Sequence, residues 1–234
     1  MEIIRTEKLE KIYRDNSVPV HALRGIDLSI SAGEFTVIAG PSGSGKTTLL
    51  NLIGALDRPT AGRVFLEGED LSTKSKSQLA NLRLSKIGFI FQAYNLIPVL
   101  TALENIEFTM MLRGVPEKER RRRAVALMEE LGIGELANKR PTEMSGGQQQ
   151  RVAVARAIVN DPTIVLADEP TANLDSVTGS RLLDLMERMN REHNITFVFS
   201  SHDPKVIERG RRLLWLRDGV IEREDVRDAV PPGN

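Results

Sequence analysis

Short, continuous runs of apolar residues recur along the chain at residues 35–39, 164–167 and 195–199. Such runs are typical of strands that are buried on both faces. A helix expected over about residues 176–191 separates the last two runs, and a strand, a helix and a further strand in this order indicate a parallel sheet. The pattern therefore predicts an α/β fold in which helices cover both faces of a parallel sheet.

Other patterns flank these runs. The loose alternation of apolar residues from Val20 to Ile30 predicts an N-terminal antiparallel β subdomain. Residues 46–56 read as a helix, and short strands are expected over residues 59–68 and 87–91. The pair Asp218-Gly219 predicts the turn of a hairpin near the C-terminus.

Between about residues 103 and 144 the apolar period becomes helical. Four apolar residues between positions 124 and 131 are spaced as one face of a helix, with Pro116 as its first residue and Gly132 after its end. Ser145 is a suitable N-cap for a further helix that ends near Val159. We therefore expect a single domain, 1–234, with a catalytic core at 1–92 and 160–224, an inserted helical subdomain at 93–159 and a frayed tail at 225–234.

Composition excludes several classes of function. The chain has 234 residues with 32 basic and 32 acidic side chains, so no net charge favours nucleic acid, and we expect no nucleic-acid partner. It has no cysteine, which excludes a thiolate nucleophile and a cysteine-ligated zinc site. No apolar run approaches the roughly 18 residues that span a bilayer, and the first residues do not resemble a signal peptide. The basic run 120–123 is expected to be a solvated helix face.

A glycine-rich loop lies between the first buried run and the first helix. It matches G-x-x-x-x-G-K-[ST], in which backbone N–H groups close around phosphate oxygens. Lys46 would supply a point charge to the β- and γ-phosphates, and Thr47 a hydroxyl ligand for Mg²⁺. A chance glycine-rich turn would not need the strand before it and the helix after it. The expected nucleotide-binding residues are Gly40, Pro41, Ser42, Gly43, Ser44, Gly45, Lys46, Thr47 and Thr48.

Two acidic residues end the second buried run. Asp168 could hold Mg²⁺, and Glu169 could polarise the attacking water as a general base. The alternative is a solvated acidic pair at the end of a strand. The phosphate loop on the same parallel sheet favours the functional interpretation.

A second helix start is rich in glycine. Ser145, Gly146, Gly147 and Gln148 begin the helix that follows the insertion, although glycine weakens a helix. The glycines are explained if backbone N–H groups must approach an anion, which the helix dipole also favours. A plain capped helix with a glycine-rich start is the alternative.

Taken together, these three segments resemble the Walker A, signature and Walker B motifs of ABC ATPases, in the order of that family. The resemblance covers nearly the whole chain. It implies that Gln92 is the Q-loop glutamine, a catalytic residue and Mg²⁺ ligand, that His202 is the switch histidine, that Asp175 belongs to the D-loop and that Tyr13 stacks on adenine. Without the resemblance, Gln92 would be a surface residue and Tyr13 simple packing. The chain has Met144 and Ser201 where the family usually has Leu and Thr, and both changes are conservative.

The resemblance also implies a mechanism and partners. ATP and Mg²⁺ would lie between Walker A of one copy and the signature of another in a head-to-tail homodimer, with a separate permease at the cytoplasmic face of the cell membrane. Residues 91–98, 100–105 and 166–175 resemble the lipoprotein-release and macrolide-export ATPases, whose permeases have few membrane helices and a large extracytoplasmic domain.

Two other classes remain open at this point. One is an ABC ATPase of DNA repair or translation, although the insertion is short and the chain has one ATPase domain. The other is a GTPase or a small-molecule kinase. Residues 138–141 lack the aspartate of a guanine-reading segment, and neither class explains residues 145–148.

Overall fold

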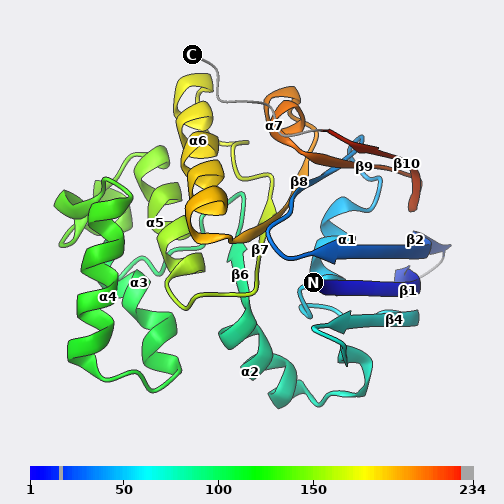
Figure 1. The fold of residues 1–234 in the computed structure, drawn as a ribbon, viewed down its shortest axis with the longest axis horizontal. Coiled ribbons are helices and arrows are strands. Elements are labelled where there is room, and N and C mark those ends of the chain that lie inside the picture. The colour runs from blue at the N-terminus through cyan, green and yellow to red at the C-terminus, as the bar shows by residue number, and fades with distance from the viewer. Residues whose placement is uncertain (16–17, 228–234) are drawn as a thin grey trace.

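The computed structural model describes residues 1–15 and 18–227. Its centre is a six-stranded sheet with the order β10-β9-β3-β8-β7-β6 (Figure 1). Neighbouring strands are parallel except β9 and β10, which the predicted turn at Asp218-Gly219 joins. The strands are β3 (Phe35–Ala39), β6 (Ile87–Ile90), β7 (Ile164–Asp168), β8 (Thr196–Ser201), β9 (Arg212–Arg217) and β10 (Val220–Val226).

Both faces of this sheet are covered, which explains the continuous apolar runs. Phe35 and Val37 of β3 belong to one buried cluster with α5 (Gly146–Ile158) and α6 (Ser176–His193). Ile38, the residue after Val37, belongs to a second cluster with α1 (Lys46–Ile53) on the other face. The prediction of a parallel sheet buried on both sides is confirmed.

The N-terminal residues form a second, antiparallel sheet with the order β2-β1-β4-β5, as the sequence predicts. Register shifts interrupt the pairing of β1 with β2, for example between Thr6 and Leu9, and hide β1 from a period-two pattern. The polar helix α2 (Lys76–Lys86) was also not expected, because it buries only Leu79. The strands are β1 (Glu2–Asp15), β2 (Val18–Ser31), β4 (Ala61–Leu66) and β5 (Glu69–Asp70).

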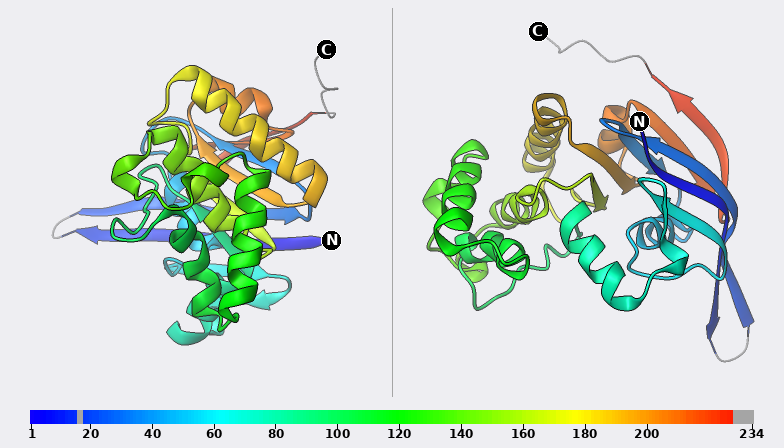
Figure 2. Two further views of the ribbon diagram at one scale, coloured as in Figure 1. Left: turned by 90° about the vertical axis from the view of Figure 1, so that its left-hand side faces the viewer. Right: turned by 60° about the horizontal axis from the view of Figure 1, so that its bottom comes forward.

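The helical insertion comprises α3 (Ala102–Leu112), α4 (Glu117–Glu130) and α5, which lie together to one side of the sheets (Figures 1 and 2). The expected apolar face of α4 is buried at Ala124 and Met128. Pro116 is the N-cap and not the first helical residue, because its ψ of 144° is extended. The basic run is only partly solvated, because Arg123 is half-buried and donates to the Val159 carbonyl oxygen at 2.6 Å.

Two predicted element ends were wrong. The first helix ends at Ile53 rather than residue 56. The tail does not fray at residue 225, because β10 continues to Val226 and Trp215 Nε1 donates to Asp225 Oδ2 at 2.8 Å. Residues 228–234 lie outside the described residues. A short helix, α7 (Pro204–Arg209), and three 3₁₀ turns at Leu71–Thr73, Gly134–Leu136 and Pro141–Glu143 complete the fold.

Within residues 1–15 and 18–227, no helix is both long enough and apolar enough to cross a membrane.

Candidate nucleotide-binding site

The phosphate loop, residues 40–47, connects β3 to α1 as the sequence predicts. Gly45 has a φ of 105°, and a Cβ atom on it would lie 2.5 Å from the Ala22 carbonyl oxygen. Only glycine fits both conditions. The loop therefore packs closely against β2 while the N-terminus of α1 opens toward it, a favourable arrangement for phosphate.

Lys46 carries a buried charge in this loop. The residue is 7% exposed, and its Nζ donates to the carbonyl oxygens of Gly40 and Pro41, each at 2.9 Å. It forms no ion pair with an acid in the described part of the chain. A buried cation without a counter-ion is costly unless an anion binds beside it. The Ser44 hydroxyl, also buried, has no hydrogen-bond partner among the described residues. Both observations fit a phosphate ligand.

Oxygen ligands converge next to the loop. Thr47 Oγ1 lies 3.0 Å from each carboxylate oxygen of Asp168, at the end of β7. Ser200, in register with Asp168 on β8, donates to Asp168 Oδ1 at 2.7 Å. Hydroxyl and carboxylate oxygens are the ligands that Mg²⁺ prefers. These residues therefore fit the metal that the sequence analysis expects.

Glu169, the expected base, has a strained backbone and two side-chain partners. Its φ is 45°, which is left-handed, as is common where function fixes a conformation. Its Oε1 lies 2.6 Å from His202 Nδ1, and its Oε2 accepts from Ser201 Oγ at 3.0 Å. The structure thus brings the expected base and the expected switch histidine into direct contact.

Gln92 is the second residue after β6, the strand beside β7. The residue is exposed, and its carbonyl oxygen accepts from Asn173 Nδ2 at 2.9 Å. Its side chain makes no hydrogen bond to the residues described, so its role as a metal ligand stays a prediction. A depression of about 410 Å³ opens at the same end of the sheet, beside Gly40, Pro41 and His202.

Tyr13 has contacts that sequence reasoning did not anticipate. Its hydroxyl donates to Asp57 Oδ2 at 3.0 Å, and Lys11 Nζ lies 4.9 Å from the ring centroid. The side chain is still 40% exposed. The contacts anchor the ring, and its stacking on adenine stays a prediction.

In the signature segment, residues 145–148, the first and last residues hydrogen-bond to each other. Ser145 Oγ accepts from the Gln148 N–H at 3.3 Å, and Gln148 Oε1 accepts from the Ser145 N–H at 2.9 Å. This capping box satisfies the side chains and leaves other N–H groups of the first turn facing outward. A Cβ atom on Gly147 would overlap Thr178 Cγ2, so packing also requires a glycine there. Among the described residues, no hydrogen bond joins this segment to the phosphate loop.

Asp175 begins the neighbouring helix α6. Its side chain accepts from the N–H groups of Val177 and Thr178, each at 3.0 Å. Hydrogen bonds from the Thr178 side chain and backbone lower the pKa of the Asp175 carboxyl. Asp175 is therefore a helix cap in this chain, and its contact with nucleotide stays a prediction.

Sequence reasoning missed the two serines that hold the acids. Ser200 and Ser201 end β8 beside Asp168 and Glu169, yet Ser201 drew attention only as a departure from the family pattern. The register of two adjacent parallel strands would have been the signal, because it places their last residues side by side.

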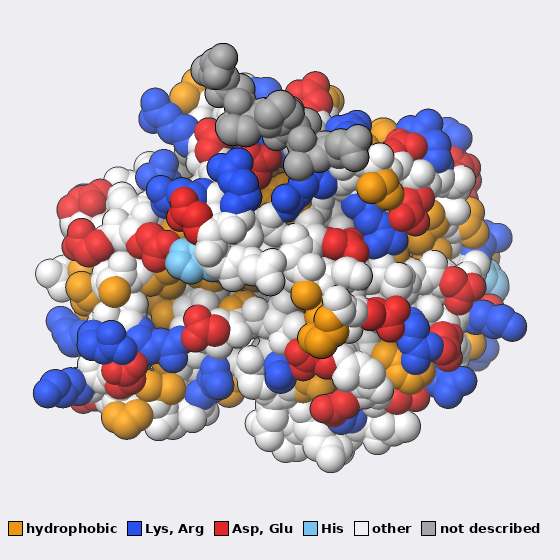
Figure 3. Space-filling view, viewed as in Figure 1, with side chains coloured by type: hydrophobic (Ala, Val, Ile, Leu, Met, Phe, Trp, Pro, Cys, Tyr) orange, Lys and Arg blue, Asp and Glu red, His pale blue; other side chains and the backbone are white. Residues whose placement is uncertain are grey.

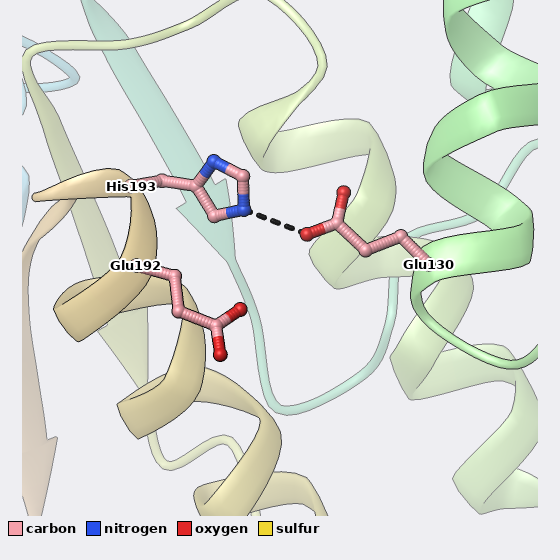
Figure 4. Close-up of side chains that lie close together, drawn as sticks. All are labelled: Glu130, Glu192 and His193. Carbon is pink, nitrogen blue, oxygen red and sulfur yellow. Dashed lines mark hydrogen bonds and ion pairs between the residues drawn. The ribbon is translucent and has the colours of Figure 1, made fainter.

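A separate group of ionisable side chains joins α4 to α6. His193 Nε2 lies 2.6 Å from Glu130 Oε1, and Glu192 extends toward the same carboxylate (Figure 4). The three ligand atoms lie within 4.8 Å of one another, and all three residues are exposed. An exposed side-chain contact of this kind links the insertion to the core and contributes little stability.

Comparison with known proteins agrees with this geometry. Residues 23–172 match the ABC transporter family. An ABC transporter ATP-binding protein of Thermotoga maritima is 50% identical over 220 residues, which cover 94% of each chain. The lipoprotein-releasing system ATP-binding protein LolD of Aquifex aeolicus is 44% identical over 97% of this chain and 99% of LolD. The macrolide export ATP-binding/permease protein MacB of Syntrophobacter fumaroxidans is 45% identical, but this chain covers only 32% of its length.

A solved structure is also similar over nearly the whole chain. The cassette MJ0796 of Methanocaldococcus jannaschii, a dimer in a post-hydrolysis state with ADP and Pi, superposes with a TM-score of 0.89. It is 41% identical in sequence, and the match covers 97% of this chain and all of that one. The family match and relatives that cover nearly the whole chain show that this protein belongs to the ABC transporter family, among its ATP-binding ATPases.

Proposed function

We propose that this chain is the ATP-hydrolysing motor of a membrane transporter of the lipoprotein-release or macrolide-export type. One observation carries the proposal. At the carboxyl end of the parallel strands, here called the sheet edge, the buried cation of Lys46 lies beside the two anchored acids Asp168 and Glu169. The second anion-binding helix start, residues 145–148, belongs to the insertion and forms no hydrogen bond to the sheet edge among the described residues. Each copy would thus supply the phosphate loop of one nucleotide site and the signature segment of the other.

The residues of the sheet edge suit hydrolysis of ATP. Lys46 and the loop N–H groups would hold the phosphates. Mg²⁺, held by Thr47 and Asp168, would neutralise charge on the β- and γ-phosphates when bound. Glu169 would accept a proton from water as the oxygen attacks the γ-phosphorus and the bond to ADP breaks. His202, hydrogen-bonded to Glu169, would hold that carboxylate in position and contact the released phosphate.

The signature segment would complete the site of a second copy. Its outward N–H groups and the positive end of the α5 dipole are suited to a γ-phosphate. A head-to-tail homodimer brings each phosphate loop against the partner's signature segment, and two sites form in one closed dimer. Binding of ATP would close the dimer, and hydrolysis would open it.

A groove between the core and the insertion is suited to the permease. It has a volume of about 600 Å³ and opens where a notch separates the insertion from α2 (Figure 3). Two arginines line it and no acid does, so a short apolar segment with a carboxylate would fit. Its apolar lining includes Leu56, Leu84, Ile87, Phe89, Phe91, Ile97, Phe108 and Leu112.

This partner would be a separate membrane protein with few membrane helices and a large extracytoplasmic domain. The motor would then lie at the cytoplasmic face of the cell membrane, as a peripheral subunit. LolD, of which this chain covers 99%, is named as the ATP-binding protein of a lipoprotein-releasing system.

Glu169→Gln tests the chemistry. Removing the base should reduce turnover by about 10²–10⁴-fold, and the variant should remain a dimer with ATP and Mg²⁺ in size-exclusion chromatography with light scattering. Glu130→Gln, an exposed change away from the sheet edge, is the control and should turn over normally. A rapidly hydrolysing Glu169→Gln chain would contradict the assignment of the base.

The tagged Glu169→Gln chain, with ATP and Mg²⁺, also tests the partner. Pull-down from native membranes followed by mass spectrometry should recover a permease of the kind described. Recovery of only soluble or ribosomal proteins would contradict the transport role.

A further inference from the structure

The segment that lines the groove, residues 91–95, has an unusual backbone. Tyr94 and Asn95 have φ values of 55° and 50°, two consecutive left-handed residues that are not glycine. Such conformations persist only where surrounding contacts enforce them. The carbonyl groups of this segment have also left the ladder of β6 and need other donors.

Two of these donors hold the beginning of the segment, Gln150 of α5 and Asn173 of the loop after β7. Gln150 Nε2 reaches the Phe91 carbonyl oxygen at 3.4 Å and the Pro170 carbonyl oxygen at 2.8 Å. Asn173 Nδ2 holds the Gln92 carbonyl oxygen. These contacts attach the beginning of the segment to α5 and to the loop after β7.

Arg156, in the last turn of α5, holds the other end of the segment. Its Nη2 donates to the Tyr94 carbonyl oxygen at 2.9 Å and its Nη1 to the Asn95 carbonyl oxygen at 2.5 Å. Burial lowers the pKa of the Arg156 guanidinium, and none of the ion pairs among residues 1–15 and 18–227 involves it. Its planar fork can bridge two adjacent carbonyls, which the single ammonium group of lysine does poorly.

The side chain of Tyr94 lies against the first turn of α5. A Cβ atom on Gly146 would lie 2.7 Å from the Tyr94 hydroxyl oxygen. The segment therefore packs against the first turn of α5 through Tyr94 and is hydrogen-bonded to α5 about ten residues further along through Arg156, a separation of about 15 Å on the helix axis.

We propose that Arg156 is a positioning residue that joins residues 91–95 and the signature segment into one unit, so that pressure on the groove moves the signature of the same copy. We call the contact of Arg156 with the Tyr94 and Asn95 carbonyl oxygens the clamp. Asn95 and Arg156 both line the groove, so a docked segment would touch the clamp directly. The effect on ATP rests on the proposed head-to-tail dimer, because in that dimer the signature segment contacts the nucleotide of the partner copy. The clamp itself is a property of one chain.

Hydrogen exchange tests the clamp in a single chain. Arg156→Lys keeps the charge and loses the two-pronged contact, so amides of residues 93–96 and 145–148 should exchange faster together, by about tenfold, while α6 is unchanged. Arg123→Lys is the matched control, since Arg123 also bridges to a backbone carbonyl near the end of α5. Unchanged exchange at residues 145–148 in the Arg156→Lys chain would overturn the inference, whether or not a dimer forms.

A second measurement separates positioning from general stability. In the Glu169→Gln background, Arg156→Lys should leave the Kd of the single chain for ATP unchanged and raise the dimer dissociation constant by about tenfold. A merely structural role would weaken both equally, and this result would also overturn the proposal. Absence of an ATP-dependent dimer in the parent Glu169→Gln chain would count against the proposed function alone.

Discussion

The sheet edge and the start of α5 both offer helix-start N–H groups to an anion, but they are stabilised differently. At the sheet edge, side chains from distant parts of the chain hold one another, as Ser200 holds Asp168 and His202 holds Glu169. At α5, the capping box of Ser145 and Gln148 is entirely local. The first region is thus prepared for chemistry within one chain. The second region has no catalytic side chains of its own and would present its N–H groups to the nucleotide of another copy.

The phosphate loop and helix α3 of the insertion each bury one ionisable side chain. Lys46 in the phosphate loop and Glu107 in α3 of the insertion are both at least nine-tenths buried, and neither has an ion-pair partner among the described residues. The charge of Lys46 lies where phosphate would bind. The buried carboxyl of Glu107 has no such explanation, and its Oε1 has no hydrogen-bond partner in the described structure.

Replacing Lys46 should produce the largest effect. Lys46→Met removes the charge that the phosphates need, so ATP affinity should fall by about 100-fold, as expected for loss of a charge-assisted contact of roughly 3 kcal/mol. The unfolding free energy of the ligand-free chain should not fall, because a buried unpaired charge is lost as well. Isothermal titration with ATP and urea unfolding measure the two quantities. A clear loss of stability with intact affinity would mean that Lys46 is structural.

Packing at the signature segment should give an intermediate effect. Gly147→Ala places a methyl group on Thr178 Cγ2, and overpacking of this kind costs about 1–3 kcal/mol of unfolding free energy. Thr178→Ser removes the opposing methyl and keeps the hydroxyl, so the double variant should recover most of the loss in urea unfolding. If Thr178→Ser gives no recovery, the glycine is required by its backbone and not by packing.

Neutralising Glu107 should have the smallest effect, with a defined pH dependence. Burial raises the pKa of the Glu107 carboxyl, so the folded chain binds its proton more tightly than the unfolded chain. The resulting stability is fully present below the ordinary glutamate pKa and is lost as pH rises through the folded pKa. Glu107→Gln should remove this loss and raise the unfolding free energy near neutral pH by about 1 kcal/mol.

Glu104, one turn earlier in α3, is the matched control with the opposite sign. Hydrogen bonds from the Thr101 backbone and side chain lower the pKa of the Glu104 carboxyl. Its stability contribution is therefore present above the ordinary glutamate pKa and is lost as pH falls. Urea unfolding across this pH range should show Glu104→Gln and Glu107→Gln changing the pH slope in opposite directions. The same slope change in both variants would contradict the account of Glu107.

The sequence could predict the features that depend on neighbours along the chain. The phosphate loop, the acids after β7 and the cap at Ser145 all combine a residue motif with an adjacent strand or helix. Contacts between distant segments could not be predicted in this way. Ser200 reaches Asp168 through strand register, and Arg156 reaches Tyr94 through the packing of α5 on the end of β6. The polar helix α2 was not predicted for a related reason, because its single buried leucine gives no periodic apolar pattern.

The central claim is that one copy supplies the phosphate loop and another the signature segment of each site. Mixing two inactive chains tests it most directly. Lys46→Met disables the loop, and Ser145→Asp keeps a good helix cap but places a negative charge where the γ-phosphate would lie. Each variant alone should hydrolyse little ATP. An equal mixture should recover about one quarter of normal turnover, because half of randomly formed dimers are mixed and each of these has one intact site. A mixture as inactive as its components would show that the two motifs do not meet across a dimer and would contradict the account.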